Sequence, residues 1–154
     1  KAGNIDIPVV FVGKPTTYVQ TLLDYISKNQ MEDRVYFRDK VIDEDLPYIY
    51  NHAEFFVYIS FFEGFGLPVI EAMASGCPVL ASIISCLLEI VGDAAMLCYP
   101  ENVEKLSNNI QLVLYNNQLC VDMIKKGKKR ALQFTPEKSV KSLMDVYKDV
   151  IENA

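Results

Sequence analysis

The sequence has little of what metal centres and disulfide frameworks require. It contains one histidine, His52, and none of its four cysteines belongs to a CxxC pair, so no zinc-binding motif is present. No basic residue flanks a cysteine to stabilise a thiolate, and we therefore interpret all of them as reduced thiols in a cytosolic core. They are Cys77, Cys86, Cys98 and Cys120. We interpret His52 as a surface residue, because no nucleophile or second ligand accompanies it.

The sequence also lacks long apolar runs and an excess of positive charge. Its longest strongly apolar run, residues 55–62, is far shorter than the roughly 20 residues of a membrane span. Twenty acidic and 15 basic residues give a net charge of −5, which provides no general surface for nucleic-acid phosphates. We therefore expect neither a membrane span nor a nucleic-acid partner.

What is present is an ordinary globular composition, with 51% hydrophobic residues in a chain of 154. This length and composition predict a single domain over residues 1–154. Up to about residue 100, short apolar runs that are typical of buried strands alternate with segments of helical periodicity. The expected strands are residues 8–12, 34–38, 55–59, 78–81 and 95–98, and the expected helices between them include those beginning near Val19, Leu46 and Pro68.

Alternating strands and helices predict an α/β fold with a parallel sheet, helices on both faces and right-handed crossovers. Beyond that region the strand signal disappears. Residues 102–154 read as a helical tail of three segments, separated at Asn116-Asn117 and at Thr135-Pro136.

The segment after the expected strand 55–59 is the place to search for a ligand site, because ligands of such sheets bind beyond the carboxyl ends of the strands. Gly64 and Gly66 stand directly before a helix N-terminus, whose free N–H groups favour an anion such as phosphate. Glu63 and Glu71 are placed to face the same cleft and to accept hydrogen bonds from sugar or ribose hydroxyls. The alternative is a tight strand-to-helix turn with solvated glutamates.

Residues 63–79, EGFGLPVIEAMASGCPV, resemble the E-x7-E signature of the retaining glycosyltransferases of family four, which have the GT-B fold. The resemblance covers nearly the whole chain. It implies a Rossmann-like sheet and identifies the chain as the C-terminal, nucleotide-sugar-binding half of such an enzyme. Further segments that carry it are residues 39–50, 89–95 and 127–135.

The resemblance implies a role for each matching residue. Glu71 is expected to bind the ribose hydroxyls of a nucleoside-diphosphate-sugar donor, and Glu63 is expected to lie by the donor sugar as the catalytic carboxylate. Phe37 and Arg38 are expected near the nucleobase. The sugar and diphosphate would contact backbone N–H groups of Gly64, Phe65, Gly66 and Leu67. The family requires no metal, and its acceptors are carbohydrates or lipid-linked sugars.

Departures from the family pattern produce further expectations. A first strand and helix, whose Arg and Lys clamp the diphosphate, are expected to be missing, together with the N-terminal acceptor domain. The chain alone is therefore expected to be inactive. Lys14 has two open interpretations, a surface lysine or a phosphate contact. Leu88 stands where the family has proline, which leaves the conformation of an expected loop over residues 85–88 undefined.

The missing strand would leave one edge of each of the strands 8–12 and 55–59 unpaired, because the family's sheet order places it between them. Direct pairing of these strands, strand donation by a second chain, or truncation of a longer enzyme would each resolve this. We favour truncation, with closure of the remaining strands or formation of a homodimer of the fragment.

Two questions remain open at the level of the sequence. The basic run of residues 125–130 is interpreted as a solvated helix face or, in a full-length enzyme that is peripheral to the membrane, as a contact to anionic lipid. For function, the alternatives to a cytoplasmic glycosyltransferase of polysaccharide biosynthesis are a nucleotide-sugar epimerase of the same fold and a non-catalytic nucleotide-binding module.

Overall fold

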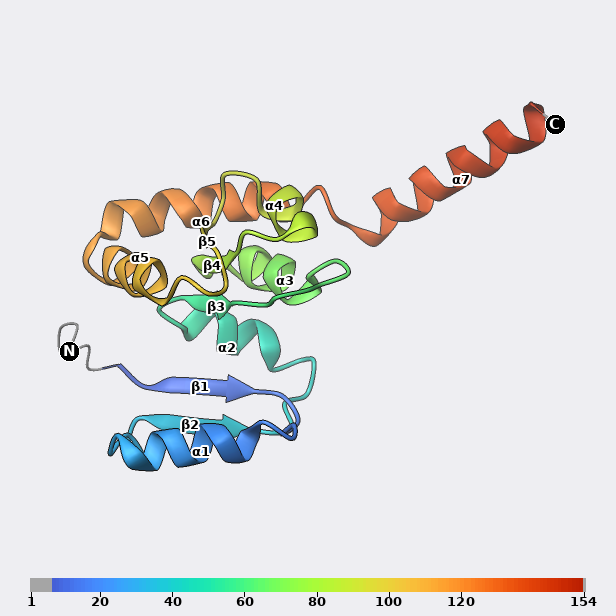
Figure 1. The fold of residues 1–154 in the computed structure, drawn as a ribbon. Helices are drawn as coiled ribbons and strands as arrows, with labels where there is room; N and C mark the ends of the chain where they lie inside the picture. The colour runs from blue at the N-terminus through green and yellow to red at the C-terminus, as the bar shows by residue number, and fades with distance from the viewer. Residues whose placement is uncertain (1–6, 154) are drawn as a thin grey trace. The chain divides into compact units, whose positions relative to one another are not determined.

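The computed structural model describes residues 7–153, and of these the side chain of Ser85 is not described. Residues 1–4, which the resemblance places just before the first expected strand, lie outside this range. Figure 1 shows strands and helices in alternation up to β5, and helices after it. The chain divides into two compact units, Lys1–Leu46 and Pro47–Ala154, and each is described by itself.

The first unit is a β-α-β motif. Strands β1 (Val9–Val12) and β2 (Val35–Arg38) pair in parallel, and helix α1 (Val19–Lys28) connects them. The register places Phe11 opposite Phe37, and their rings stack with centroids 5.3 Å apart. Ile26 of α1 is buried.

The second unit contains a parallel sheet of order β3-β4-β5. Its strands are β3 (Phe56–Tyr58), β4 (Val79–Ser82) and β5 (Met96–Cys98), and helix α2 (Leu46–His52) precedes them. Helix α3 (Leu67–Ser75) connects β3 to β4, and α4 (Ser85–Val91) connects β4 to β5. All of β4 is buried, which explains its continuous apolar sequence.

Three helices follow the sheet: α5 (Val103–Tyr115), α6 (Asn117–Ala131) and α7 (Pro136–Glu152). Asn102, Asn116 and Thr135 cap their N-termini by accepting hydrogen bonds from backbone N–H groups. Helix α6 packs on α3 so closely that a Cβ at Gly127 would lie 3.3 Å from the Met73 side chain. Helix α7 has no buried residue.

The expected α/β class and parallel strands are confirmed, and each expected strand is found within two residues of its predicted bounds. Within residues 7–153, β1 and β2 form a two-stranded sheet in the first unit, and β3, β4 and β5 form a three-stranded sheet in the second. The division falls where the resemblance places a further strand. Direct pairing of the strands 8–12 and 55–59, strand donation and truncation therefore all stay predictions.

One expectation was wrong: residues 85–88 are not a loop but the first turn of helix α4. Leu88 retains the N–H group that a proline would lack, and it donates to the carbonyl of Ile84 at 3.1 Å. Leu87, Ile90 and Val91 are buried at helical spacing, so packing stabilises the helix as well. In the described part of the chain, no helix is both long enough and apolar enough to cross a bilayer.

Candidate functional site

The candidate site lies where β3 ends and α3 begins. Gly66 is the N-cap residue of α3, with φ of +102°, a conformation that side chains with a Cβ rarely adopt. A Cβ at this position would also collide with the side chain of Leu87 in α4. The glycine that the sequence placed before the helix is therefore required by the turn itself.

The loop before α3 presents backbone N–H groups. Among residues 7–153, no intramolecular acceptor is found for the N–H groups of Gly64, Phe65, Gly66 and Leu67. The start of α3 adds the positive end of its helix dipole. Pro68 has no N–H group and occupies the first turn, where none is needed. This arrangement suits a ligand with negatively charged oxygens.

Glu63 is held by one of its two carboxylate oxygens. Tyr58 Oη donates to Glu63 Oε1 at 2.7 Å, and Ser60 Oγ donates to the same atom at 2.8 Å. Cys86 Sγ lies 3.1 Å from the Glu63 carbonyl and ties the loop to α4. Within the described chain, Oε2 has no hydrogen-bond partner. The carboxylate is thus oriented, with one oxygen left to accept hydrogen bonds.

Burial, followed by the hydrogen bond to Glu63 and the charge of that carboxylate, raises the pKa of Tyr58 to about 12. The phenol therefore remains neutral and acts as a hydrogen-bond donor throughout the physiological pH range. Ser60 N donates to Ser82 Oγ at 2.7 Å, which fixes the end of β3 to the end of β4.

Glu71 lies in α3 and is exposed, and its role at a ligand stays a prediction. Tyr50 of α2 donates to Glu71 Oε2 at 3.3 Å. Tyr50 is itself buried, and burial together with the charge of Glu71 raises the pKa of its hydroxyl. Each of the two predicted carboxylates thus accepts a hydrogen bond from a tyrosine.

Phe65 in the loop packs against the segment between α6 and α7. Its ring meets Phe134 edge to face, with centroids 6.0 Å apart. The Arg130 guanidinium lies 5.1 Å from the centre of the Phe134 ring and donates through Nε to the Ile90 carbonyl at 2.7 Å. The C-terminal ends of α4 and α6 therefore support the loop.

The remaining sequence candidates belong to other elements of the chain. Phe37 and Arg38 end β2 in the first unit, and their role at the nucleobase stays a prediction. Lys14 is exposed in the same unit, and both of its interpretations remain open. His52 is exposed at the end of α2, with Nδ1 2.8 Å from the Tyr48 carbonyl, which confirms its assignment to the surface.

Two side chains of the basic run over residues 125–130, in α6, contact other parts of the molecule. Lys126 pairs with Asp93 at 2.8 Å, and Arg130 makes the contacts described above. A solvated helix face accounts for these observations, and contact with anionic lipid stays a prediction.

The four cysteines are free thiols, and burial raises the pKa of Cys77 to about 12. The described residues include no group of three or more His, Cys, Asp or Glu side chains placed to hold a metal ion.

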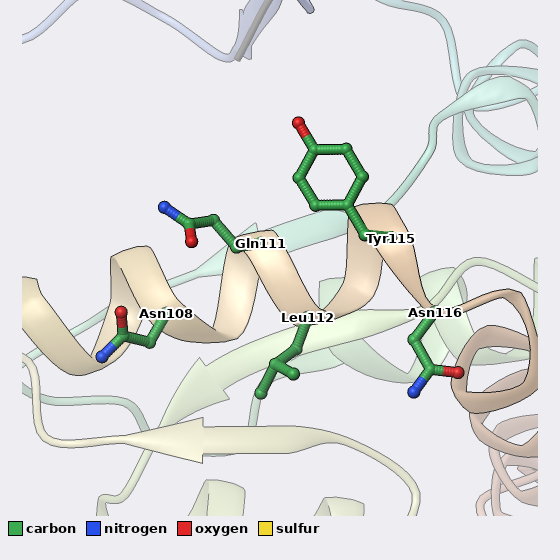
Figure 2. Close-up of a pocket in the computed structure, with 5 residues that line it drawn as sticks. All are labelled: Asn108, Gln111, Leu112, Tyr115 and Asn116. Atoms are coloured by element: carbon green, nitrogen blue, oxygen red, sulfur yellow. The ribbon is translucent and has the colours of Figure 1, made fainter. Parts of the chain in front are cut away.

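A cavity of about 550 Å³ opens elsewhere, along α5. Figure 2 shows its lining side chains, which come from α5 and the residue that follows it. They are amides, a leucine and a tyrosine, without a carboxylate, histidine or cation that would give the cavity a chemical role. The residues are Asn108, Gln111, Leu112, Tyr115 and Asn116.

Sequence reasoning found the two glutamates and the glycine loop but missed the residues that hold them. Tyr50, Tyr58, Ser60 and Phe134 were not singled out. For Tyr58 and Ser60 a signal existed, because both lie within five residues of Glu63 where the strand ends. Tyr50 and Phe134 contact the site only through the tertiary fold, which the sequence pattern does not report.

Comparison with known proteins places this chain in a family. Residues 1–130 match the family described as "Glycosyl transferases group 1". The chain is 35% identical over 141 residues to O-antigen chain mannosyltransferase B of Escherichia coli, covering 92% of this chain and 37% of that protein.

Two solved structures have folds that are similar to the fold of this chain. Sucrose-phosphate synthase of Thermosynechococcus elongatus is similar with a TM-score of 0.84 and 27% identity, over 94% of this chain and 39% of that one. Anabaena HepE in complex with UDP-glucose is similar with a TM-score of 0.75 and 25% identity, over 82% of this chain and 36% of that one.

The chain belongs to the group 1 glycosyltransferases, within the GT-B superfamily. It spans about 37% of the length of the mannosyltransferase that it matches. The family resemblance noted in the sequence is confirmed at this level.

Proposed function

We propose that this chain is the donor-binding part of a retaining glycosyltransferase of family four, in which Glu63 and Glu71 form the E-x7-E pair. The reaction would move a sugar from a nucleoside diphosphate to a carbohydrate or lipid-linked acceptor. The observation that carries the proposal is the arrangement at the start of α3. Two oriented carboxylates flank a loop of unpaired N–H groups, which matches the hydroxyls and phosphates of a nucleotide sugar.

The two carboxylates are assigned to different parts of the donor. Glu71 binds the ribose hydroxyls, and Glu63 binds the sugar next to the bond that breaks. The N–H groups of Gly64 to Leu67 bind the diphosphate and the sugar between them. HepE, similar in fold, was crystallised with UDP-glucose, which supports a nucleotide sugar as the ligand class. The acceptor site is proposed to lie in the part of the enzyme outside this chain.

Replacing Glu71 with alanine is expected to weaken the binding of the bare nucleotide by about tenfold or more. A hydrogen bond to a charged group contributes roughly 1.5–3 kcal/mol, and the ribose hydroxyls would lose theirs. The measurement is calorimetric titration of the intact enzyme with UDP, GDP and ADP. Glu63→Ala is the matched control, because it removes the other carboxylate and should leave affinity for the bare nucleotide within about twofold. Equal losses for the two variants would contradict the assignment.

We further propose that the diphosphate is bound without a metal ion. Charge on the leaving nucleotide would be stabilised by the α3 N–H groups, the helix dipole and basic side chains. Transfer by the intact enzyme in excess EDTA is therefore expected to stay within about twofold of the untreated rate. A loss of more than tenfold that added Mg²⁺ or Mn²⁺ restores would refute metal-independent binding.

A further inference from the structure

Tyr58 occupies a position from which its hydroxyl can fix the Glu63 carboxylate. It is the last residue of β3, and its partner in the parallel register is Ala81 of the buried strand β4. Its ring stacks on Phe56 with centroids 5.7 Å apart, and Phe56 meets Tyr50 edge to face at 5.2 Å. Strand pairing and ring packing together restrict where the Tyr58 hydroxyl can be.

The Tyr58 hydroxyl contacts only one of the two oxygens of the Glu63 carboxylate. The 2.7 Å contact to Glu63 Oε1 has the length of a hydrogen bond to a charged acceptor. Ser60 donates to the same oxygen, so Oε1 is occupied by two donors while Oε2 has no partner among the described residues. A glutamate on a loop has several rotatable bonds, and a fixed oxygen removes much of that freedom before a ligand arrives.

We propose that Tyr58 is a positioning residue, whose hydroxyl anchors Glu63 Oε1 and thereby leaves Oε2 oriented to accept a hydrogen bond from the donor sugar. This inference rests on the proposed function, because it requires Glu63 to contact that sugar. Tyr58 itself touches no reacting atom; it acts through the carboxylate.

The anchoring role predicts coupling between Tyr58 and Glu63. Tyr58→Phe removes one oxygen and retains the ring that stacks on Phe56. In the intact enzyme, with UDP-glucose and GDP-mannose each tested as the donor, we expect kcat/KM to fall about tenfold. Inhibition by UDP alone should stay within about twofold, because the bare nucleotide does not reach Glu63. In a Glu63→Ala background, which removes the oxygen that Tyr58 anchors, Tyr58→Phe should change kcat/KM by less than about twofold.

Tyr36→Phe is the matched control. It also removes a tyrosine hydroxyl that donates a hydrogen bond, here to the Asp33 carbonyl at 2.9 Å in the first unit. We expect this variant to match the parent in every assay.

The outcomes of these assays distinguish a failure of the Tyr58 positioning role from a failure of the proposed function. If Glu63→Gln lowers kcat/KM but Tyr58→Phe does not, the positioning role is wrong and the proposed function stands. If Tyr58→Phe has the same effect in both backgrounds, it acts independently of Glu63, and the inference again fails. A melting temperature lowered by more than about 5 °C would show that the hydroxyl supports the fold instead. If Glu63→Gln itself has no effect, the proposed function is overturned, and the inference with it.

Discussion

Glu63→Gln is expected to lower sugar transfer by the intact enzyme by about 100-fold, with UDP affinity within about twofold of the parent. Breaking the bond between a sugar and its leaving group develops positive charge on the sugar ring, and a nearby carboxylate stabilises that charge. Glutamine keeps the shape of the side chain and one oxygen acceptor but removes the negative charge. The loss should therefore appear in kcat, measured as nucleotide released at saturating donor.

Glu54→Gln provides the control for this experiment. Glu54 is exposed and precedes β3, at the opposite end of the strand from Glu63. Its replacement removes the same charge from the same protein and should leave kcat unchanged within about twofold. A Glu63→Gln enzyme that retains more than half of the parent kcat would contradict the assignment of Glu63 to the donor sugar.

Gly66→Ala is expected to destabilise the chain by about 3 kcal/mol in urea unfolding. Forcing a residue with a Cβ into the positive φ region costs roughly 1–3 kcal/mol, and the new methyl group must also displace Leu87, which is fully buried. Because Leu87 belongs to α4, the disturbance should spread from the loop to that helix. The turn that presents the N–H groups of the site would be distorted as well.

Gly64→Ala tests whether the loss of stability is specific to Gly66 or follows from adding a side chain anywhere in the loop. Gly64 lies two residues earlier, outside the positive φ region, and a Cβ there meets no atom within 4 Å. Its replacement should change stability by less than about 0.5 kcal/mol. Equal unfolding midpoints for the two variants would mean that Gly66 is not held in the observed conformation in solution.

Most of the fold follows from local signals. The apolar run at residues 78–81 predicts a strand, and β4 is a strand that is buried throughout. The run at residues 8–12 predicts a strand buried on both faces, which was wrong for burial, because all four residues of β1 are exposed. Pro68 and Gly76 predict the ends of a helix, and α3 has proline in its first turn and Gly76 in the left-handed conformation as its C-cap. The family pattern predicts a loop over residues 85–88, whereas these residues begin helix α4, in which Leu87, Ile90 and Val91 are buried at helical spacing.

The location of the candidate site in the chain was also predictable from local signals. Glu63, Glu71 and the glycine loop stand in one contiguous segment, so their spacing alone placed them at the start of α3. The hydrogen bonds that orient the glutamates were not predictable in this way. Tyr50 is 21 residues from Glu71 in the sequence, and only the packing of α2 beside α3 brings the two together. Such contacts depend on the tertiary fold rather than on any local pattern.

The most direct test of the donor-binding account is an NMR titration of the ¹⁵N-labelled chain with UDP-glucose and GDP-mannose, which also detects millimolar binding. We predict saturable shifts of the backbone amides of Gly64, Phe65, Gly66 and Leu67, which have no acceptor within the described chain. The amides of α7 should stay unchanged. If the loop amides are unmoved by both nucleotide sugars at saturating concentration, the account of this loop as the donor site is contradicted.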